Sequence, residues 1–181
     1  EVDAGGERRF RYWRDQAAVR AYFEVLAPDI TPLESAAPTL SALYFSGISL
    51  AILPPASRER LFAVARKVAQ HGGRVVFDNN FRPRLWADRR VAQEAFAEAL
   101  ALSDIAFITL DDEQLLHGDS SLDAALERTM TLTCPELVVK RGALPTLVKV
   151  GGQAAEEVPT VPVAKVVDTT AAGDSFAGAY L

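Results

Sequence analysis

The chain has 181 residues, 49% of them hydrophobic, which is enough to fold one domain around a substantial core. Its 19 basic and 24 acidic residues give a net charge of -5 without a Lys/Arg-rich tract, so we expect no nucleic-acid partner. No apolar run is long enough to cross a bilayer and no signal peptide opens the chain, which predicts a cytoplasmic protein with no membrane partner.

The first predicted element is an exposed strand over residues 7–14. Its two-residue alternation places Tyr12 and Arg14 on one face and Trp13 on the other. A lid strand over a site has this pattern, and so does an ordinary edge strand. We therefore assign residues 1–14 to part of a substrate-covering β segment and residues 15–181 to an α/β core. The chain starts without Met and ends inside a predicted helix, so we expect a piece truncated at both ends.

Short apolar runs alternate with helix-period segments through the middle of the chain. The predicted strands are 43–45, 75–77, 105–108 and 137–139. The first predicted helix is capped by Ser57 and closed by Gly72 and Gly73. Further helices are predicted over residues 88–102, where Val91 should face inward, and over 112–117 and 122–131. Strands this apolar, alternating with helices, indicate a parallel sheet covered on both faces. Segments 146–150 and 155–163 are typical of an antiparallel hairpin, so we predict a mixed sheet with an antiparallel edge.

Polar residues follow each predicted strand, and ligands of open α/β sheets bind beyond the carboxyl ends of the strands. The successive clusters are Ser46-Gly47, residues 78–83, Thr109 with residues 111–113, residues 140–142, and residues 168–176. Each has a local alternative: Asn79 and Asn80 fit a turn, Arg82 a surface ion pair, residues 111–113 acidic decoration of a helix start, and Lys140 a solvated strand end. Their agreement at consecutive strand ends predicts one shared site.

The run Asp-Thr-Thr-Ala-Ala-Gly-Asp-Ser-Phe at residues 168–176 puts small residues at a turn and Asp174 where a helix begins. Backbone N–H groups at such a helix start hold phosphate oxygens when no bulky side chain screens them. A carboxylate there accepts a proton or positions a metal. A small-residue turn with an Asp near a helix start is the open alternative.

The remaining chemistry-bearing residues indicate structural roles. The single cysteine, Cys134, excludes an internal disulfide framework, and before Pro135 it fits a small core or loop residue. His71 and His117 both lie near predicted helix ends, where a structural role is the usual one. No His/Cys/carboxylate spacing resembles a zinc site, and no Gly-x-Ser-x-Gly elbow predicts a hydrolase.

The run at 168–176 resembles the C-terminal signature of the ribokinase-like (PfkB-type) carbohydrate kinases, whose usual form is Asp-Thr-x-Gly-Ala-Gly-Asp-x-Phe. Within that family, the chain resembles the 2-keto-3-deoxygluconate kinases at segments 12–14, 44–50, 77–86, 109–113 and 139–142. The resemblance covers essentially the whole chain. It implies a three-layer αβα sandwich with a mostly parallel sheet, an antiparallel edge and a small β lid that is partly missing here. It also implies ATP-dependent phosphorylation of a sugar acid, with ATP and Mg²⁺ as cofactors.

The resemblance further implies roles for individual residues. Asp174 is the expected base for the sugar hydroxyl, the amides of Ala171, Ala172 and Gly173 are the expected anion hole, and Glu113 is expected to organise Mg²⁺ through water. The residues implied in substrate binding are Tyr12, Trp13, Arg14, Arg82 and Asp174. Those implied in nucleotide binding are Asn80, Phe81, Arg82, Lys140, Arg141, Gly142, Ala143, Ala171, Ala172 and Gly173. The physics agrees, since phosphoryl transfer needs mainly positioning and charge, and an arginine fork matches a substrate carboxylate.

Two positions depart from the family pattern. Ala171 stands where a Gly is usual, so we expect the backbone there to avoid a positive φ. Leu110 occupies the Asn position of the usual Asn-x-x-Glu pattern, which leaves only Glu113 for the Mg²⁺ shell. The alternatives are a kinase of a neutral sugar such as fructose or ribose, a catalytically silent sugar- or nucleotide-binding regulator, and a fragment inactive alone. A homo-oligomer paired through lid strands is a further expectation.

Overall fold

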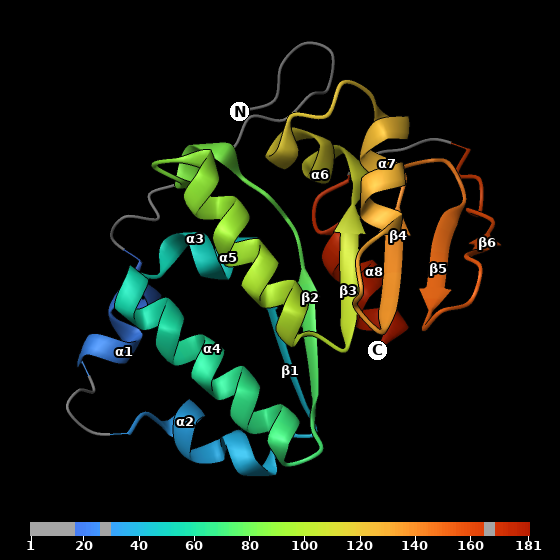
Figure 1. Ribbon diagram of the computed structural model, residues 1–181. Helices are drawn as coiled ribbons and strands as arrows, with labels where there is room; N and C mark the ends of the chain where they lie inside the picture. Colours follow the sequence, from blue (N-terminus) through green and yellow to red (C-terminus); the bar gives the residue numbers. More distant parts are fainter. Residues whose placement is uncertain (1–16, 26–29, 165–168) are drawn as a thin grey trace.

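The computed structural model describes residues 17–25, 30–164 and 169–181. Within them the sheet has six strands in the spatial order β1 to β6, and β6 lies at the right-hand edge in Figure 1. The strands are β1 (Ala42–Ser46), β2 (Arg74–Asp78), β3 (Ile105–Thr109), β4 (Glu136–Lys140), β5 (Thr146–Val150) and β6 (Glu156–Val158). Neighbours from β1 to β4 pair in parallel, whereas β5 and β6 are antiparallel. The predicted mixed sheet is confirmed, although β6 is shorter than the predicted segment 155–163.

Helices connect the strands in the predicted alternation. Those before the second strand are η2 (Ala18–Ala21), α1 (Tyr22–Val25), α2 (Pro32–Ala36), η3 (Ala37–Thr39), α3 (Gly47–Ile52) and α4 (Pro55–Gln70). Those after it are η4 (Pro83–Leu85), α5 (Arg89–Leu102), α6 (Leu110–His117), α7 (Leu122–Met130) and α8 (Ala172–Tyr180). Among these described elements, no helix combines the length and the apolar character needed to span a bilayer.

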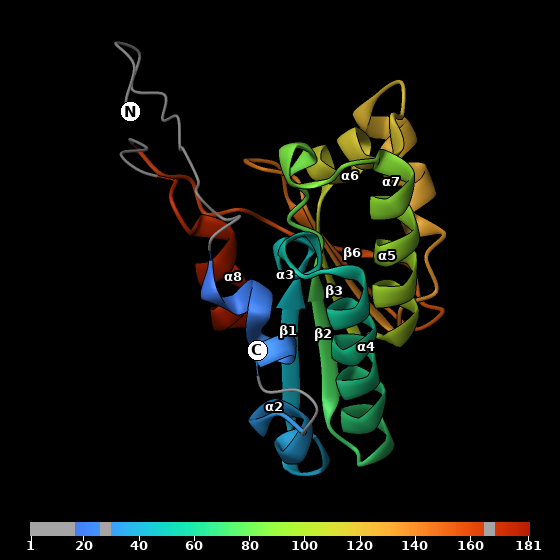
Figure 2. The same ribbon diagram turned by 90° about the vertical axis from the view of Figure 1, so that its left-hand side faces the viewer.

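The alternation of strand residues builds a core on each face of the sheet. On one face Phe45 and Phe77 pack with α4 and α5, and Ile108 and Val139 continue the same layer under α6 and α7. On the other face Val76, Ile105, Phe107 and Val138 cluster with Ala177 of α8. Figure 2 shows α8 and α4 on opposite sides of the sheet. This arrangement confirms the predicted α/β fold with helices on both faces.

Two local expectations differ from the structure. Ser57 is buried in the first turn of α4 and does not cap it, because Pro54 is the capping residue and Pro55 takes the first helical position. On α5 the buried residue of the first turn is Ala92, whereas Val91 is 37% exposed; the inward positions Ala95 and Phe96 are buried as expected. The predicted strand at 7–14 lies outside the described residues.

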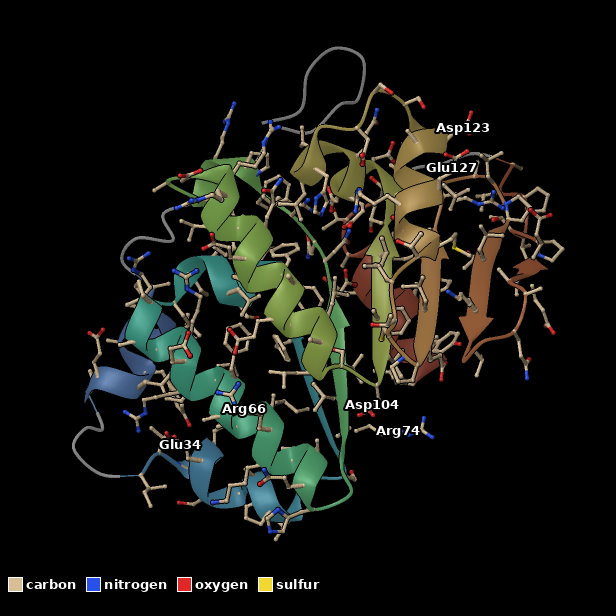
Figure 3. All side chains as sticks on the ribbon, viewed as in Figure 1. Glu34, Arg66, Arg74, Asp104, Asp123 and Glu127 are labelled. Atoms are coloured by element: carbon tan, nitrogen blue, oxygen red, sulfur yellow. The ribbon has the colours of Figure 1, made fainter. Side chains whose placement is uncertain are left out.

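Gly47 shows why a glycine follows β1. A Cβ at this position would collide with the backbone carbonyl of Asn79 and with the Phe96 ring. The start of α3 therefore lies directly against the chain that leaves β2, and only a residue without a side chain permits this approach. The carboxyl ends of β1 and β2 are therefore held side by side, where the polar clusters gather. Arg74 and Asp104, labelled in Figure 3, lie at the opposite, amino ends of the strands. Asp104 accepts a hydrogen bond there from the Val75 amide at 2.8 Å.

Candidate functional site

A cavity of about 290 Å³ opens where the carboxyl ends of β2, β3 and β4 meet the start of α8. Its polar lining comes from the predicted clusters: Asp78, Asn80, Arg82, Thr109, Asp112, Lys140, Thr169, Ala171, Ala172, Gly173 and Asp174. The structure thus brings four of the predicted strand-end clusters to one place. Ser46 and Gly47 do not line this cavity; the β1 cluster serves to lock the neighbouring backbone instead.

The start of α8 forms an anion cradle, here meaning residues 171–174. Ala171 has φ of 57° and ψ of 18°, so the expectation that it avoids a positive φ is wrong. The left-handed conformation costs alanine about 1–2 kcal/mol. Its physical reason is geometric: a left-handed residue followed by helical residues turns successive N–H groups toward one side, which makes a concave anion-binding nest.

The hydrogen bonds of the cradle leave some of its donors available. The Ala172 amide donates to the Thr169 carbonyl at 3.2 Å, and the Ser175 amide donates to the Ala171 carbonyl at 2.8 Å. Gly173 lies in the first helical turn, where an amide has no intrahelical acceptor. Asp174 is exposed in the same turn and lines the cavity. Gly173 and Asp174 of the cradle therefore line the same cavity.

A buried ion pair lies beside the cradle. The Lys140 ammonium is 2.9 Å from Oδ2 of Asp78, and their side chains are 13% and 3% exposed. The Tyr44 hydroxyl donates to the same Oδ2 at 3.4 Å. Burial, followed by the charges of Asp78 and Asp174, raises the pKa of Tyr44 well above its usual value, so this hydroxyl keeps its proton. The Lys140 ammonium and the Asp78 carboxylate thus stand as a paired group in the cavity wall.

Arg82, expected at the substrate, forms a second ion pair in the cavity wall. Its guanidinium lies 3.2 Å from both carboxylate oxygens of Asp112 and also donates to the Phe81 carbonyl at 2.8 Å. Burial raises the pKa of Asp112 even though Arg82 opposes the shift. The Arg82 side chain is 46% exposed, so part of the fork faces solvent and remains open to an anion.

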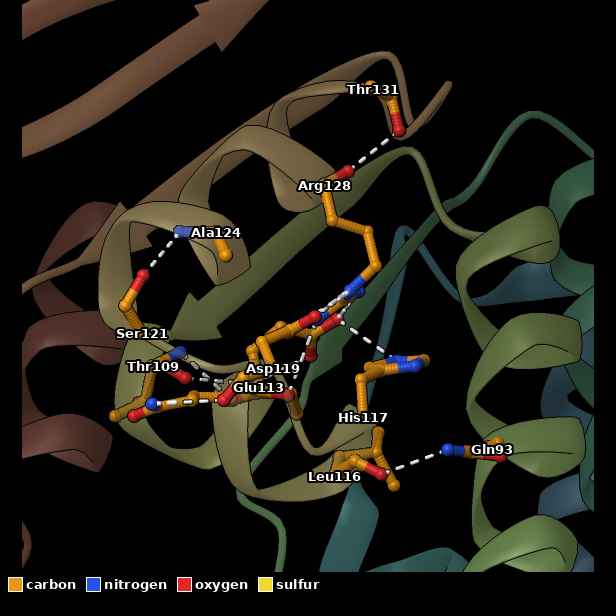
Figure 4. A network of polar contacts seen from close by, with 12 residues as sticks. Gln93, Thr109, Glu113, Leu116, His117, Asp119, Ser121, Ala124, Arg128 and Thr131 are labelled. Atoms are coloured by element: carbon orange, nitrogen blue, oxygen red, sulfur yellow. Dashed lines mark hydrogen bonds and ion pairs between the residues drawn. The ribbon is translucent and has the colours of Figure 1, made fainter.

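Glu113 occupies a different environment from the cavity (Figure 4). Its carboxylate, 1% exposed, is 2.9 Å from Arg128 and 3.4 Å from His117, and it accepts a hydrogen bond from Asn79 at 3.3 Å. Burial alone would raise the pKa of Glu113, but the hydrogen bonds from His117 and Arg128 outweigh burial and lower it. Glu113 does not line the cavity, but its partner Asn79 precedes Asn80, which does. Its expected role at Mg²⁺ stays a prediction.

The other predicted nucleotide-binding residues are scattered. Asn80 lines the cavity with φ of 27°, and its side-chain oxygen is buried with no hydrogen-bond partner among the described residues. Phe81 is buried in the core against Phe96. Arg141 donates to the Pro145 carbonyl and to Glu157, where it ties together the β5–β6 hairpin, while Gly142 and Ala143 are exposed in the turn before β5. The predicted substrate residues Tyr12, Trp13 and Arg14 lie outside the described residues.

Sequence reasoning missed several residues of the cavity. Asp78, Thr109 and Asp112 line it, although none was assigned a role beyond a strand-end cluster. The available signal was position, because Asp78 and Thr109 are the last residues of β2 and β3. Tyr44 left no such signal, since it lies in the middle of β1 and reaches Asp78 through sheet pairing. Cys134 is buried and its pKa is raised to about 11 by burial, in agreement with a core role.

Comparison with known proteins agrees with this geometry. The model of the pfkB family carbohydrate kinases matches residues 1–181. The chain is 49% identical to 2-dehydro-3-deoxygluconokinase of Dickeya dadantii (strain 3937), with 100% of the chain aligned to 58% of that protein. It is 46% identical to 2-dehydro-3-deoxygluconokinase of Escherichia coli (strain K12), again over the whole chain and 59% of the relative. The chain therefore spans a little under three fifths of these relatives.

Solved structures share the fold. Aminoimidazole riboside kinase from Salmonella enterica, solved with aminoimidazole riboside and an ATP analog, superimposes with a TM-score of 0.66 at 31% identity, over 76% of this chain and 45% of that one. Fructokinase from Vibrio cholerae O395, bound to fructose, ADP and a calcium ion, gives a TM-score of 0.66 at 32% identity, over 76% of this chain and 43% of that one. The chain and these solved structures thus share the ribokinase-like fold. The chain belongs to the pfkB family of carbohydrate kinases.

Proposed function

We propose that the full-length protein transfers the γ-phosphoryl group of ATP to 2-keto-3-deoxygluconate and forms 2-keto-3-deoxy-6-phosphogluconate. The observation that carries this proposal is the cavity lined by Asp174, Gly173 and Lys140 together. The relatives named 2-dehydro-3-deoxygluconokinase support the choice of substrate, because they are 38–49% identical, whereas the fructokinases are about 30% identical.

The chain's own residues divide the work of the proposed reaction. Asp174 accepts the proton of the sugar's primary hydroxyl while the hydroxyl oxygen attacks the γ-phosphorus. The amides of the anion cradle hold the oxygens of the transferring group. Arg82, together with Arg14, Tyr12 and Trp13 of the predicted lid, recognises the keto-acid end. Asn80 and the chain around residues 140–143 border the nucleotide.

Mg²⁺ is expected to arrive with ATP, where it neutralises charge on the phosphates. No cluster of three or more His, Cys, Asp or Glu side chains suited to a metal occurs among the described residues. Mg²⁺ fits such a site nevertheless, since it keeps several waters and needs only one or two carboxylates besides the phosphates. Asp112 lines the cavity, and burial raises its pKa, so a nearby cation would stabilise its ionised carboxylate. Glu113 would act on that shell only through Asn79 or water. Pairing of subunits through lid strands stays a prediction.

A substrate panel tests this proposal. The full-length protein is assayed for ADP release with 2-keto-3-deoxygluconate, fructose and ribose, each with MgATP. A charge-assisted hydrogen bond contributes about 1.5–3 kcal/mol, so we expect kcat/KM for the sugar acid to exceed that for either neutral sugar by roughly tenfold to a hundredfold. The Arg82→Gln variant should lose most of that preference, chiefly through a higher KM. Faster phosphorylation of fructose or ribose would contradict the substrate assignment, and no turnover of any sugar would favour a silent binding protein.

A further inference from the structure

We propose that Lys140 is a catalytic residue that contacts the transferring phosphoryl group, and that Asp78 is the positioning residue that holds its ammonium in the cavity wall. This inference rests on the proposed kinase function and deepens it. The family resemblance implies only that Lys140 borders the nucleotide, and it implies no role for Asp78.

The geometry places the ammonium next to the cradle. Lys140 is the last residue of β4, and a Cβ added to Gly173 would lie 3.7 Å from its Nζ. Its side chain is only 13% exposed, and both Lys140 and Gly173 line the same cavity. An oxygen held by the Gly173 amide is therefore within reach of the lysine.

The hydrogen bonds of Lys140 are incomplete. An ammonium has three N–H donors, and among the described residues Lys140 uses one of them, toward Asp78. The face of the Phe107 ring, 5.8 Å from Nζ, adds a cation–π contact but accepts no full hydrogen bond. A charge this buried is costly unless its donors are satisfied. The remaining donors lie at a cavity that also holds an anion cradle, which indicates an anionic oxygen as their acceptor.

Asp78 is suited to hold Lys140 and unsuited to take the substrate proton. Its side chain is 3% exposed, and one carboxylate oxygen, Oδ2, receives both the Lys140 ammonium and the Tyr44 hydroxyl. These contacts come from β1 and β4, so the carboxylate fixes two side chains across the sheet. Asp174, in contrast, is exposed to the cavity and has no ion-pair partner among the described residues. The two carboxylates therefore have separate tasks.

The chemistry assigns Lys140 a charge role without a change in its protonation. The bond from the γ-phosphorus to the β–γ bridging oxygen breaks, a bond from the sugar hydroxyl oxygen to phosphorus forms, and the hydroxyl proton passes to Asp174. ADP leaves with the bridging electron pair. Lys140 takes no part in the proton transfer, and its ammonium stabilises negative charge on the transferring group.

The test uses variants of the full-length protein. Lys140→Met removes the charge but leaves Asp78 buried without its partner, which can destabilise the fold. The double variant Asp78→Asn with Lys140→Met removes both charges together and avoids that cost. Lys149→Met is the matched control, because Lys149 lies on the neighbouring strand β5, and its ammonium contacts the Met130 carbonyl, away from the cavity lining. Thermal melting and ADP binding establish that each variant is folded.

We expect both Lys140 variants to lower kcat about 100-fold, equivalent to about 2.7 kcal/mol, with KM for ATP and sugar changed less than threefold. Asp78→Asn alone should lower kcat less than Lys140→Met does, and the double variant should be no slower than Lys140→Met. Binding of ADP with aluminium fluoride, a mimic of the transferring group, should weaken in parallel with kcat, whereas binding of ADP alone should not. A folded double variant with kcat within threefold of wild type would overturn the inference.

These outcomes separate the inference from the proposed function. If the wild-type protein phosphorylates the sugar acid and the Lys140 variants do so equally well, the kinase proposal stands and the lysine assignment is wrong. If the wild type prefers a different acceptor, the same variants are measured with that acceptor and with ADP and aluminium fluoride. Parallel losses there support Lys140 even though the substrate assignment has failed, and unchanged binding contradicts it.

Discussion

Replacing Arg128 with Met tests the interpretation of Glu113 as a buried, structurally paired carboxylate. The substitution removes the guanidinium 2.9 Å from Glu113 and 2.7 Å from Asp119, and retains a side chain of similar length. Glu113 keeps His117 at 3.4 Å and Asn79 at 3.3 Å. Breaking a buried ion pair costs about 3–5 kcal/mol. Because Arg128 is 29% exposed and two partners remain, we expect a loss of about 3 kcal/mol at pH 7.

Urea unfolding of the wild type and the variant measures this loss. With a slope of about 2 kcal/mol per molar urea, a loss of about 3 kcal/mol moves the midpoint by roughly 1.5 M. In the wild type the pKa of Glu113 is lowered, so its stabilising contribution is present at neutral pH and is lost as the pH falls through that lowered pKa. Without Arg128, burial should raise the pKa of Glu113, so protonation relieves the variant as the pH falls. The gap between the two proteins should therefore shrink from pH 8 to pH 5.

Glu113→Gln introduced into the Arg128→Met variant is the matched control. Gln removes the buried charge and still offers an oxygen to Asn79, so this double variant should regain most of the lost stability at pH 7. A difference between wild type and Arg128→Met that stays constant from pH 8 to pH 5, or a double variant less stable than Arg128→Met, would refute the reasoning. Either result would mean that Glu113 is not an ionised group held by Arg128.

Two further predictions concern stability. Gly47→Ala places a methyl group against the Asn79 carbonyl and Phe96, so we expect the free energy of unfolding in urea to fall by about 1–3 kcal/mol. Gly152→Ala is the control, because a Cβ there meets nothing within 4 Å, and it should be neutral. Equal effects of the two substitutions would contradict the close approach at Gly47. Hydrogen bonds from Arg60, ahead of those from Thr31, lower the pKa of Glu34, labelled in Figure 3, from 4.5 to about 2. The ionised Glu34 stabilises the fold above pH 4.5, and this stabilisation is lost toward pH 2. Glu34→Gln should therefore lower the free energy of unfolding by about 1–2 kcal/mol at pH 7, after allowance for its partial exposure, and by almost nothing at pH 2. A loss of stability independent of pH would argue against the ion pair.

Sequence reasoning predicted the strands and helices because each apolar run has one clear period. Leu43 to Phe45 and Val75 to Phe77 became β1 and β2 within a residue or two at each end. The rule that ligands bind beyond strand ends also located the cavity, since Asp78, Thr109 and Lys140 terminate adjacent parallel strands. These features are local, or follow from the order of elements along the chain.

The features that sequence reasoning did not predict depend on interactions that cross the fold. The pairing of Glu113 with Arg128 depends on how the turn between α6 and α7 brings the two helices together, and no spacing in the sequence encodes it. The conformation of Ala171 was predicted from the steric preference of alanine, but the surrounding turn imposes a left-handed backbone that orients the cradle amides. Tyr44 entered the site through the pairing of β1 with β2 and through Asp78.

The central claim is that Asp174 at the start of α8 is the base of a phosphoryl-transfer site. The most direct test is the turnover of the Asp174→Asn variant of the full-length protein, measured beside ADP binding. Because general-base catalysis contributes about 10²–10⁴-fold, kcat should fall by at least 100-fold, while the ADP dissociation constant changes less than threefold. A variant that keeps near-wild-type kcat would contradict the assignment of Asp174 and the site built around it.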